Sequence, residues 1–392
     1  MTGDYLTFHD VYTHLVEYER VNPSTERQHM HRRAVFAAMR EIATVHKWSY
    51  YQQLGRISTV AKYDTGTISY DHTGGTYERQ VTLTSGTWPT WAAFGTIVIS
   101  SIAYDVADRK SDTVITLTSA LNPGADVAAL TTYDLFRDSY VLPVDVWTID
   151  QVFPEASRPA LQPAHPRTIL ASKRYYGSAG TPCRFTVIGS RKYQGLMDIV
   201  LDPYPTQAET YDFVYSRQPA KIAVQDAIAG TVSVTASGTT VTGDSTEFSS
   251  NMVGALIRLG TNAKDLPTGN EGGNPFDQER TVMSVASTTS LTVDAAWTTT
   301  RTGVKYVISS PIDIDLLVMG NAFFRCCENQ LAKLVRLGGP QGMAATEQLY
   351  QGALLRAREA DVRLTTPMRV GGTVYGRRLS DFPGFPDVAD VE

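Results

Sequence analysis

Apolar residues recur with helical spacing near both ends of the chain. In the N-terminal part, residues three or four positions apart share one helical face: Phe8, Val11, Leu15 and Tyr18. Ser24 can cap a second helix with its body from Arg27 to Lys47. The buried stripe of that helix would include Val35, Met39 and Ile42, followed by Val45 or His46. The pattern therefore predicts two amphipathic helices at the start of the chain.

The C-terminal part shows the same periodicity. We expect a helix capped by Ser310, with Pro311 in its first turn, that ends before Gly338. Its apolar stripe would consist of Leu316, Met319, Phe323, Cys327, Leu331 and Leu334. A following helix, 344–364, would bury one face made of Leu349, Ala353, Ala357, Ala360 and Leu364. The small residues on that face favour close approach of a neighbouring helix.

Between these helical segments the apolar period falls to 2, which is typical of β-strands. The inward positions of the first strands would be Val81, Leu83, Ile97, Ile99, Val114, Ile115 and Leu117. A Pro-rich connector at 154–166 separates them from three further strands, each closed by Gly or Pro. The region from 57 to 226 is therefore expected to be rich in short strands.

The Thr-, Ser- and Gly-rich stretch GTVSVTASGTTVTGDSTEF at 230–248 predicts a hairpin and not a linker. Its two alternating runs, 231–234 and 239–242, contain Val residues that can bury one face, and Gly238 lies between them. Further short strands follow up to residue 310, so we expect a small all-β module, a compact barrel or sandwich.

Together these patterns predict an α+β protein. Its core would be a discontinuous helical bundle formed from both termini, with inserted all-β domains, one of them a small β-barrel or sandwich. The expected parts are N-terminal helices at 1–56, a β-rich insertion at 57–226, the small β module at 227–310, C-terminal helices at 311–366 and an extended tail at 367–392.

Composition narrows the possible functions. The formal net charge of −5 and the lack of a long Lys/Arg run disfavour a protein that grips nucleic-acid phosphates. The three cysteines, Cys183, Cys326 and Cys327, cannot form a disulfide framework, which fits a reducing compartment. The polar first 20 residues do not resemble a signal peptide, and no apolar run has the length of a membrane span. We therefore expect a soluble protein made in a cytoplasm.

No catalytic motif stands out, so we expect no enzyme activity, metal or cofactor. The chain lacks phosphate-loop, nucleophile-elbow, HExxH and CxxC patterns. His29 and His31 point apart on a helix, which predicts a solvated surface. Cys326 and Cys327 are interpreted as packing residues, because the apolar stripe already includes one of them. The carboxylates Asp105, Asp108 and Asp112 lie near one another in sequence, but ADRKSD mixes both charges, which favours a hairpin turn over a catalytic pair.

Two segments are better candidates for partner contacts. The loop from Asn262 to Arg280 is long for a compact domain, and such loops are often functional. Its candidate contact residues are Asp265, Asn270, Glu271 and Phe276. The basic residues of LLRAREADVRL, which are Arg356, Arg358 and Arg363, either form a solvated helix face or contact an acidic partner or DNA.

Three segments resemble proteins of tailed bacteriophages. The run GTVSVTASGTTVTG…MVGALIRLG…TVMSVASTTSLTVD resembles a small β-barrel module of phage structural proteins. The segment GTWPTWAAFGTIVI…YDLFRDSYVLP resembles phage virion proteins, some of unknown function and some of head–tail function. PIDIDLLVMGNAFFRCCENQLAKL and QLYQGALLRAREADVRL resemble the helical bundle of head-to-tail adaptor, or connector, proteins. The chain is longer than minimal adaptors because of its β insertions.

The resemblance implies a structural virion protein. Such adaptors form a ring, commonly of twelve copies, between the portal protein and the tail tube or nozzle, and the ring continues the DNA channel without sequence-specific binding. Their C-terminal segment often reaches into the portal. By this resemblance, the tail would contribute Tyr375, Arg377, Arg378, Phe382 and Phe385 as contact residues. The expected location is the neck of the virion, after synthesis in the host cytoplasm.

Two other classes of protein remain open at this point. A tail-tip or receptor-binding protein would use the Thr/Ser-rich β modules and the abundant Tyr and Trp for carbohydrate contact. An enzyme acting on polysaccharide would need a pair of carboxylates, for which the sequence offers only scattered candidates.

Overall fold

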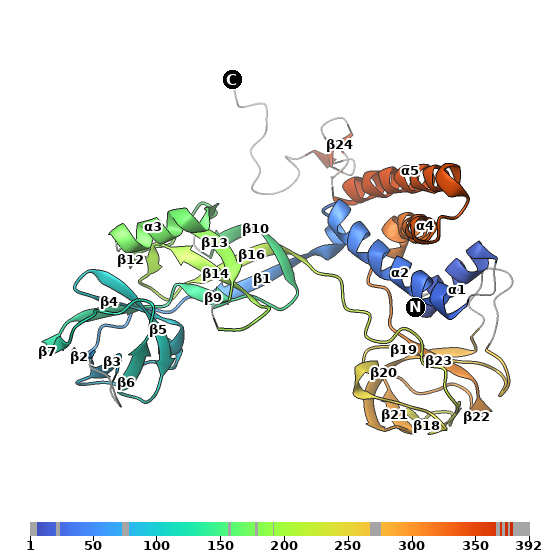
Figure 1. Ribbon diagram of the computed structural model, residues 1–392, viewed down its shortest axis with the longest axis horizontal. Coiled ribbons are helices and arrows are strands. Elements are labelled where there is room, and N and C mark those ends of the chain that lie inside the picture. The colour runs from blue at the N-terminus through green and yellow to red at the C-terminus, as the bar shows by residue number, and fades with distance from the viewer. Residues whose placement is uncertain are drawn as a thin grey trace. The chain divides into compact units, whose positions relative to one another are not determined.

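The computed structural model describes residues 6–20, 24–72, 78–155, 158–176, 179–190, 192–266 and 276–365, together with three two-residue strands near the C-terminus. The protein is of mixed α+β class, as expected from the sequence (Figure 1). It divides into two compact units, one formed by residues 1–50 and 219–392 and the other by residues 51–218. Each unit is described separately.

In the first unit, the two N-terminal helices are those expected from the sequence. Helix α1 spans Phe8–Glu19 and begins with a capping box, because the Thr7 amide donates to the Asp10 carboxylate at 2.8 Å and the Thr7 hydroxyl accepts from the Asp10 amide. Helix α2 spans Thr25–Val45, and the Ser24 hydroxyl accepts from the amide of Arg27 at 3.4 Å. The prediction of Ser24 as the cap is confirmed.

The C-terminal helices begin at other residues than the sequence suggested. Helix α4 spans Leu316–Val335 and is capped by Asp315, whose carboxylate accepts from the amides of Leu317 and Val318. The expected start at Ser310 was wrong. The Ser310 hydroxyl instead accepts from the Ala223 and Val224 amides, and Pro311 pairs with Thr7 in an isolated bridge. Strand β23 ends at residue 309, so the chain needs this connection before it can turn into a helix.

Helix α5 spans Gly339–Thr365, five residues longer at its start than expected. Pro340 therefore lies in the first turn of α5, where its missing N–H costs no helical hydrogen bond. Helix α4 ends at Val335, about one turn before the start of α5. Its C-cap residue, Arg336, has the left-handed conformation at φ 54°.

The buried faces of α4 and α5 agree only in part with the expected stripes. In α4 the stripe is buried at Met319, Phe323, Cys327 and Leu331, whereas Leu316 is 39% exposed.

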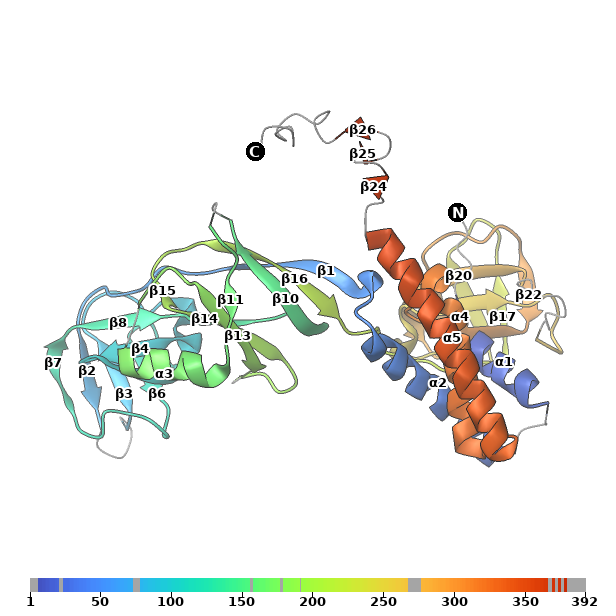
Figure 2. The ribbon, with the colours of Figure 1, turned by 90° about the horizontal axis from the view of Figure 1, so that it is seen from above.

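In α5, Ala353 and Ala357 are buried as expected, but Leu349 is 54% exposed. Tyr350 and Leu354 are buried beside these two alanines. The side of α5 that faces the core is therefore shifted from the expected one, by about one residue towards Tyr350 and Leu354. The two helices lie side by side, and α4 also contacts α1 and α2 (Figures 1 and 2).

The first unit also contains the small β module expected at 227–310. Its strands are β17 (Thr231–Val234), β18 (Thr240–Asp244), β19 (Leu256–Leu259), β20 (Gln278–Ser287), β21 (Ser290–Val293), β22 (Arg301–Val304) and β23 (Tyr306–Ser309). The predicted hairpin at 231–242 is confirmed as β17 and β18. The strands form one nearly closed, barrel-like antiparallel sheet in the order β22-β17-β18-β21-β20-β19-β23. We call this the second β module.

The second unit contains several sheets. The largest, which we call the first β module, comprises β2 (Ile68–Asp71), β3 (Gln80–Leu83), β4 (Thr96–Ile99), β5 (Ile102–Arg109), β6 (Val114–Leu117), β7 (Val127–Thr131) and β8 (Tyr133–Phe136). Most of its expected inward positions are buried; Val114 is only half-buried. Its hairpin between β5 and β6 contains Asp112, so the turn expected in ADRKSD is confirmed.

The remaining strands of this unit pack beside the first β module. One sheet has the order β1-β16-β10, with bounds Gln52–Ser58, Thr210–Arg217 and Val146–Pro154. Another has the order β11-β13-β14-β9, with bounds Gln162–Pro163, Arg184–Gly189, Met197–Asp202 and Ser139–Val141. Strands β12 (Ala179–Gly180) and β15 (Tyr204–Pro205) form a short parallel pair.

Helix α3 (Pro166–Tyr176) was missed by the sequence analysis, which expected strands directly after the Pro-rich connector. It packs against β13 and β14. Its only strongly buried apolar residue among those described is Ile169.

The two β modules share one topology, which the sequence analysis did not anticipate. The order of the first is β7-β2-β3-β6-β5-β4-β8, and replacing each strand by its counterpart in chain order gives the order of the second. The pairing registers also correspond. In the first module a bulge lies between Val106 and Asp108 of β5, and in the second it lies between Val282 and Ser284 of β20.

Corresponding side chains occupy corresponding places in the two cores. Trp88 packs edge-on against Tyr133 with ring centroids 5.2 Å apart, and Phe248 packs in the same way against Tyr306 at 5.8 Å. The Tyr133 hydroxyl donates to the Thr65 carbonyl at 2.8 Å, and the Tyr306 hydroxyl donates to the Ala229 carbonyl at 2.7 Å. The chain therefore contains the same β module twice, once in each unit.

A glycine in the left-handed conformation precedes the first strand of each module. Gly66 has φ +82° and Gly230 has φ +77°, and a Cβ atom on either would lie 2.2 Å from a backbone carbonyl oxygen. The short matches GTISY and GTVSV begin at these two glycines. The same backbone constraint thus acts at the same point of both modules.

We predict that Gly66→Ala and Gly230→Ala each lower the free energy of unfolding by about 2 kcal/mol or more, because left-handed strain and a backbone clash add. Gly254→Ala is the matched control, since Gly254 also has a positive φ but no atom within 4 Å of its added Cβ. Chemical denaturation measures the difference. An equal loss in all three variants would show that backbone conformation alone matters.

Candidate partner interface on the terminal helices

The solvent-facing side of α5 combines exposed apolar residues with basic ones. Leu355 and Val362, two helical turns apart, are 58% and 50% exposed, and Leu349 is 54% exposed. The predicted contact residues Arg356 and Arg363 are also exposed and follow Leu355 and Val362 directly. We call these five residues the α5 stripe. Exposed apolar side chains alternating with Arg are typical of surfaces that bind proteins.

Arg358, the third basic residue expected to contact a partner on this helix, has a contact within the chain. It is half-buried, and its guanidinium donates to the carbonyl of Val45 at 2.7 Å. Val45 is the last residue of α2, so one of its unsatisfied terminal carbonyls is satisfied by α5. The structure thus separates Arg358 from Arg356 and Arg363.

The residues predicted in the long loop belong to the second β module. Asp265 is exposed, and its amide donates to the Asn262 side chain at 3.0 Å. Phe276 is half-buried, with the Arg258 guanidinium 5.6 Å from its ring centroid. Asn270 and Glu271 lie outside the described residues. The last three residues of the expected loop, 278–280, belong to strand β20.

The predicted tail contacts can be placed only in part. Tyr375, Phe382 and Phe385 lie outside the described residues. Arg377 and Arg378 form strand β26, which pairs with β25 (Thr373–Val374), and β25 pairs with β24 (Arg369–Val370). These pairings concern the backbone alone.

A partly buried His–carboxylate contact joins helices α1 and α4. The His14 ring lies 3.0 Å from the Glu328 carboxylate, which also accepts from Arg325 at 2.7 Å. Burial by itself would raise the pKa of Glu328, but the hydrogen bonds from His14 and Arg325 outweigh it and lower the pKa. The negative charge of Glu328 is therefore kept between α1 and α4.

A second contact of this kind joins the end of α2 to the end of α5. His46 Nε2 lies 3.1 Å from Asp361, and the Ser49 amide donates to the same carboxylate at 3.2 Å. Gln330 of α4 also donates to Glu41 of α2. In sequence, His14 and His46 are each more than 300 residues from their partners. No local pattern in the sequence could have identified these pairs.

The expectation of a solvated surface is correct for His29 and wrong for His31. His29 is exposed, whereas His31 is fully buried and its Nε2 lies 2.7 Å from Glu19. Glu19, the last residue of α1, also accepts from Arg27. The sequence gave no sign of this contact, because Glu19 and His31 belong to different helices and meet only when α1 packs on α2.

The two adjacent cysteines are packing residues, as expected. Cys326 and Cys327 are fully buried in α4, and burial raises the pKa of both thiols above the usual range. Cys183 is exposed, and all three are free of disulfides. Among the described residues, no group of three His, Cys, Asp or Glu is arranged to hold a metal ion.

Comparison with known proteins gives no assignment. No protein-family model matches the sequence, and no curated protein matches it significantly. Within the described part of the chain, no helix is long and apolar enough to cross a membrane.

Glu347 provides a pH-dependent link between α5 and α4. Its carboxylate accepts from Lys333 at 2.6 Å, from Gln351 at 2.7 Å and from Asn329 at 2.8 Å. These contacts, led by Lys333, lower the pKa of Glu347 to about 2. A carboxylate with a depressed pKa stabilises the fold above its unfolded pKa, and that stabilisation is lost as the pH falls.

We predict that Glu347→Gln costs about 1 kcal/mol near neutral pH, the value expected for a partly exposed ion pair. The difference from the wild type should shrink as the pH falls from about 4.5 towards 2. Urea denaturation at a series of pH values measures it. Glu359→Gln, on the exposed side of the same helix, controls for the loss of one charge. A difference that stays constant down to pH 2 would contradict the prediction.

Proposed function

We propose that this protein is a head-to-tail adaptor of a tailed bacteriophage, a structural protein of the virion neck and not an enzyme. The observation that carries the proposal is that helices from both ends of the chain pack together in one unit, through α4. In this proposal α1, α2, α4 and α5 act as one discontinuous bundle, and the β modules are insertions. This is the organisation that the sequence resemblance to adaptors implies.

The contacts between the chain ends support a rigid bundle. Glu328 and Asp361 are both buried, each with a His from the other end of the chain within 3.1 Å. Removing either His would leave a buried carboxylate with fewer hydrogen-bond donors, which is destabilising. A ring subunit that carries force between head and tail needs helices that do not separate.

The α5 stripe supplies a surface for neighbouring subunits or for the portal protein. Its apolar residues can be buried by a partner, and Arg356 and Arg363 can pair with acidic groups at the edge of the contact. In the proposed assembly, about twelve copies would form a ring between the portal and the tail tube or nozzle. The net charge of −5 would let DNA pass through the channel without tight binding.

Cross-linking mass spectrometry on the intact particle tests the proposal. Cross-links from α4 and α5 to a portal subunit, together with links to a tail-tube or nozzle protein, are the expected result. Links only to fibre or baseplate proteins would overturn it and favour the alternative, a tail-tip or receptor-binding protein.

We predict that Leu355→Glu with Val362→Glu prevents ring assembly without lowering the thermal stability of the monomer. Burying each of these side chains is worth about 1.5–3 kcal/mol, and both are exposed in the single chain. Native mass spectrometry and thermal unfolding measure the two effects. Leu170→Glu, an exposed Leu on helix α3 of the other unit, is the control and should leave assembly intact. Assembly by the double variant would exclude the α5 stripe as an interface.

Truncation after Pro367 is predicted to prevent assembly while the remaining chain stays folded. The prediction rests on the Pro-punctuated, weakly apolar composition of the last 25 residues. Such a segment suits an extended conformation along a neighbouring subunit. Circular dichroism reports the fold, and native mass spectrometry reports assembly. Loss of helical signal in the truncated chain would show that the tail stabilises the monomer instead.

A further inference from the structure

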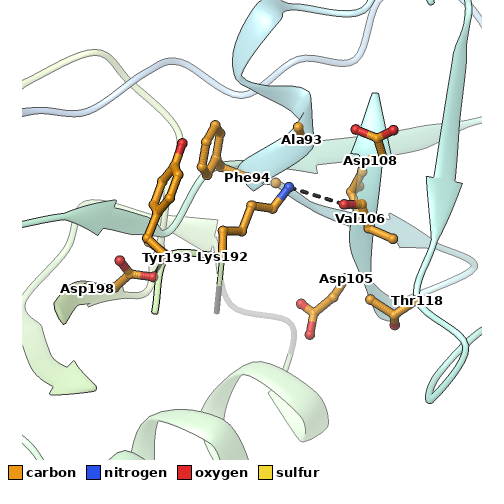
Figure 3. Close-up of a pocket in the computed structure, with 12 residues that line it drawn as sticks. Ala93, Phe94, Asp105, Val106, Asp108, Thr118, Lys192, Tyr193 and Asp198 are labelled. Atoms are coloured by element: carbon orange, nitrogen blue, oxygen red, sulfur yellow. Dashed lines mark hydrogen bonds between the residues drawn. The ribbon is translucent and has the colours of Figure 1, made fainter. Parts of the chain in front are cut away.

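The first β module lines a cavity that the proposed function does not use. The cavity has a volume of about 450 Å³, which is within the usual range for ligand sites. One wall is the module itself, through strand β5 and the short 3-10 helix η2 (Thr90–Phe94). The opposite wall is the hairpin between β13 and β14, which contributes Lys192, Tyr193 and Asp198 (Figure 3). All of these elements belong to the same unit.

The cavity is acidic. Asp105 and Asp108 of β5 and Asp198 of β14 line it. The bulge after Val106 makes Ala107 an extra residue in the strand, which allows Asp105 and Asp108 to reach the same cavity. Lys192 is the single cation among the lining residues, and the Arg137 guanidinium lies 5.3 Å from the Phe94 ring centroid. With both cations counted, the three carboxylates leave an excess of one negative charge when they are ionised.

Asp198 has an unused acceptor. Asp198 is only 4% exposed, and one of its carboxylate oxygens, Oδ2, accepts from the Ser139 hydroxyl at 3.1 Å. The other oxygen, Oδ1, is buried without a hydrogen-bond partner among the described residues. A buried carboxylate oxygen without a donor is costly, and a donor brought by a ligand would remove that cost.

The aromatic wall of the cavity already attracts cations. The Lys192 ammonium lies 4.7 Å from the centroid of the Phe94 ring, and the Arg137 guanidinium lies 5.3 Å from it. Tyr193 lies near the same ring, with the centroids 6.1 Å apart. Figure 3 shows Lys192 extending along Phe94 towards β5, where its ammonium donates to the Ala107 carbonyl at 3.2 Å. Burial lowers the pKa of Lys192, so its charge is held less firmly than that of an exposed lysine.

The second β module shows that the barrel fold does not require these residues. At the positions that correspond in strand register, Gly254 replaces Phe94, Thr281 replaces Asp105 and Ser284 replaces Asp108. The cores of the two modules nevertheless match, as the paired aromatic contacts show. The acidic and aromatic lining is therefore a property of the first module alone, beyond what its fold needs.

We propose that this cavity binds the guanidinium group of an arginine side chain, with Asp105, Asp108 and Asp198 as acceptors and Phe94 and Tyr193 as the stacking surface. A guanidinium offers several N–H donors in one plane, which suits two carboxylates and an aromatic face together. An ammonium offers no plane to stack. The guanidinium can come from a partner polypeptide or from free arginine.

Isothermal titration calorimetry on the full chain tests the proposal with the peptide acetyl-Gly-Arg-Gly-amide. The control ligand carries citrulline, which has nearly the same shape as arginine but no charge. We expect the arginine peptide to bind at least tenfold more tightly than the citrulline peptide. Argininamide, titrated separately, distinguishes the two sources: equal affinity assigns the site to a small molecule, and weaker affinity assigns it to a polypeptide.

Variants test the site itself. Asp108→Asn should weaken the arginine peptide about tenfold, whereas Asp112→Asn, on the neighbouring hairpin turn and paired with Arg109, should not change it. The double change Asp105→Thr with Asp108→Ser installs the residues of the second module and should abolish binding. Lys192→Met should strengthen binding several-fold, because it removes the competing cation. This titration is independent of ring assembly, so its result does not depend on the adaptor proposal.

Three results would overturn the proposal. One is equal binding of the arginine and citrulline peptides. Another is unchanged affinity in both Asp108→Asn and the double variant, with thermal unfolding showing that both are folded. Absence of measurable binding to the wild type and to Lys192→Met would have the same meaning, because the second variant excludes occlusion by Lys192.

Discussion

The burial of helix α4 is the constraint on which the first unit depends. Met319, Phe323, Cys326, Cys327 and Leu331 are fully buried, on more than one side of the helix. One neighbouring helix cannot cover so wide an apolar surface, and α5 covers only one side. The N-terminal helices α1 and α2 provide the rest, although they are about 300 residues away in sequence. Long insertions between them are tolerated because the entropy of closing a loop grows slowly with its length.

The polar contacts around α4 give this packing its specificity. Apolar surfaces alone would allow the helices to slide or rotate, since hydrophobic burial has no direction. Glu328 with His14, Asp361 with His46, and Glu19 with His31 each fix one relative position of two helices. A buried carboxylate that loses its partner is penalised strongly, so these pairs favour a single arrangement. The exposed α5 stripe is thereby held in a defined position relative to the other helices.

The repeated β module shows how one fold can acquire different surfaces. The two copies keep corresponding registers, a bulge at the same place and an edge-on aromatic pair in the core, Trp with Tyr in the first copy and Phe with Tyr in the second. They differ where the first copy faces the β13–β14 hairpin, and there carboxylates and Phe94 take the place of smaller, neutral residues. Core positions are constrained by packing density, whereas positions at the rim tolerate substitution, so new chemistry arises at the rim.

The sequence by itself determined the α+β fold class, the helices with periodic apolar residues and most of the strands. It also determined the hairpin at 231–242, because helix caps, apolar period and turn residues act over a few positions. Even locally it misplaced the start of α4, where Ser310 and Asp315 are competing caps. It also missed α3, which follows the Pro-rich connector directly. Only the tertiary structure decided which side of α5 is exposed, that His31 is buried, and that Asp105, Asp108 and Asp198 share a cavity. It also revealed that the two β modules repeat one topology. These features depend on residues far apart in the chain, whose contacts are set by how the elements pack and not by any local pattern.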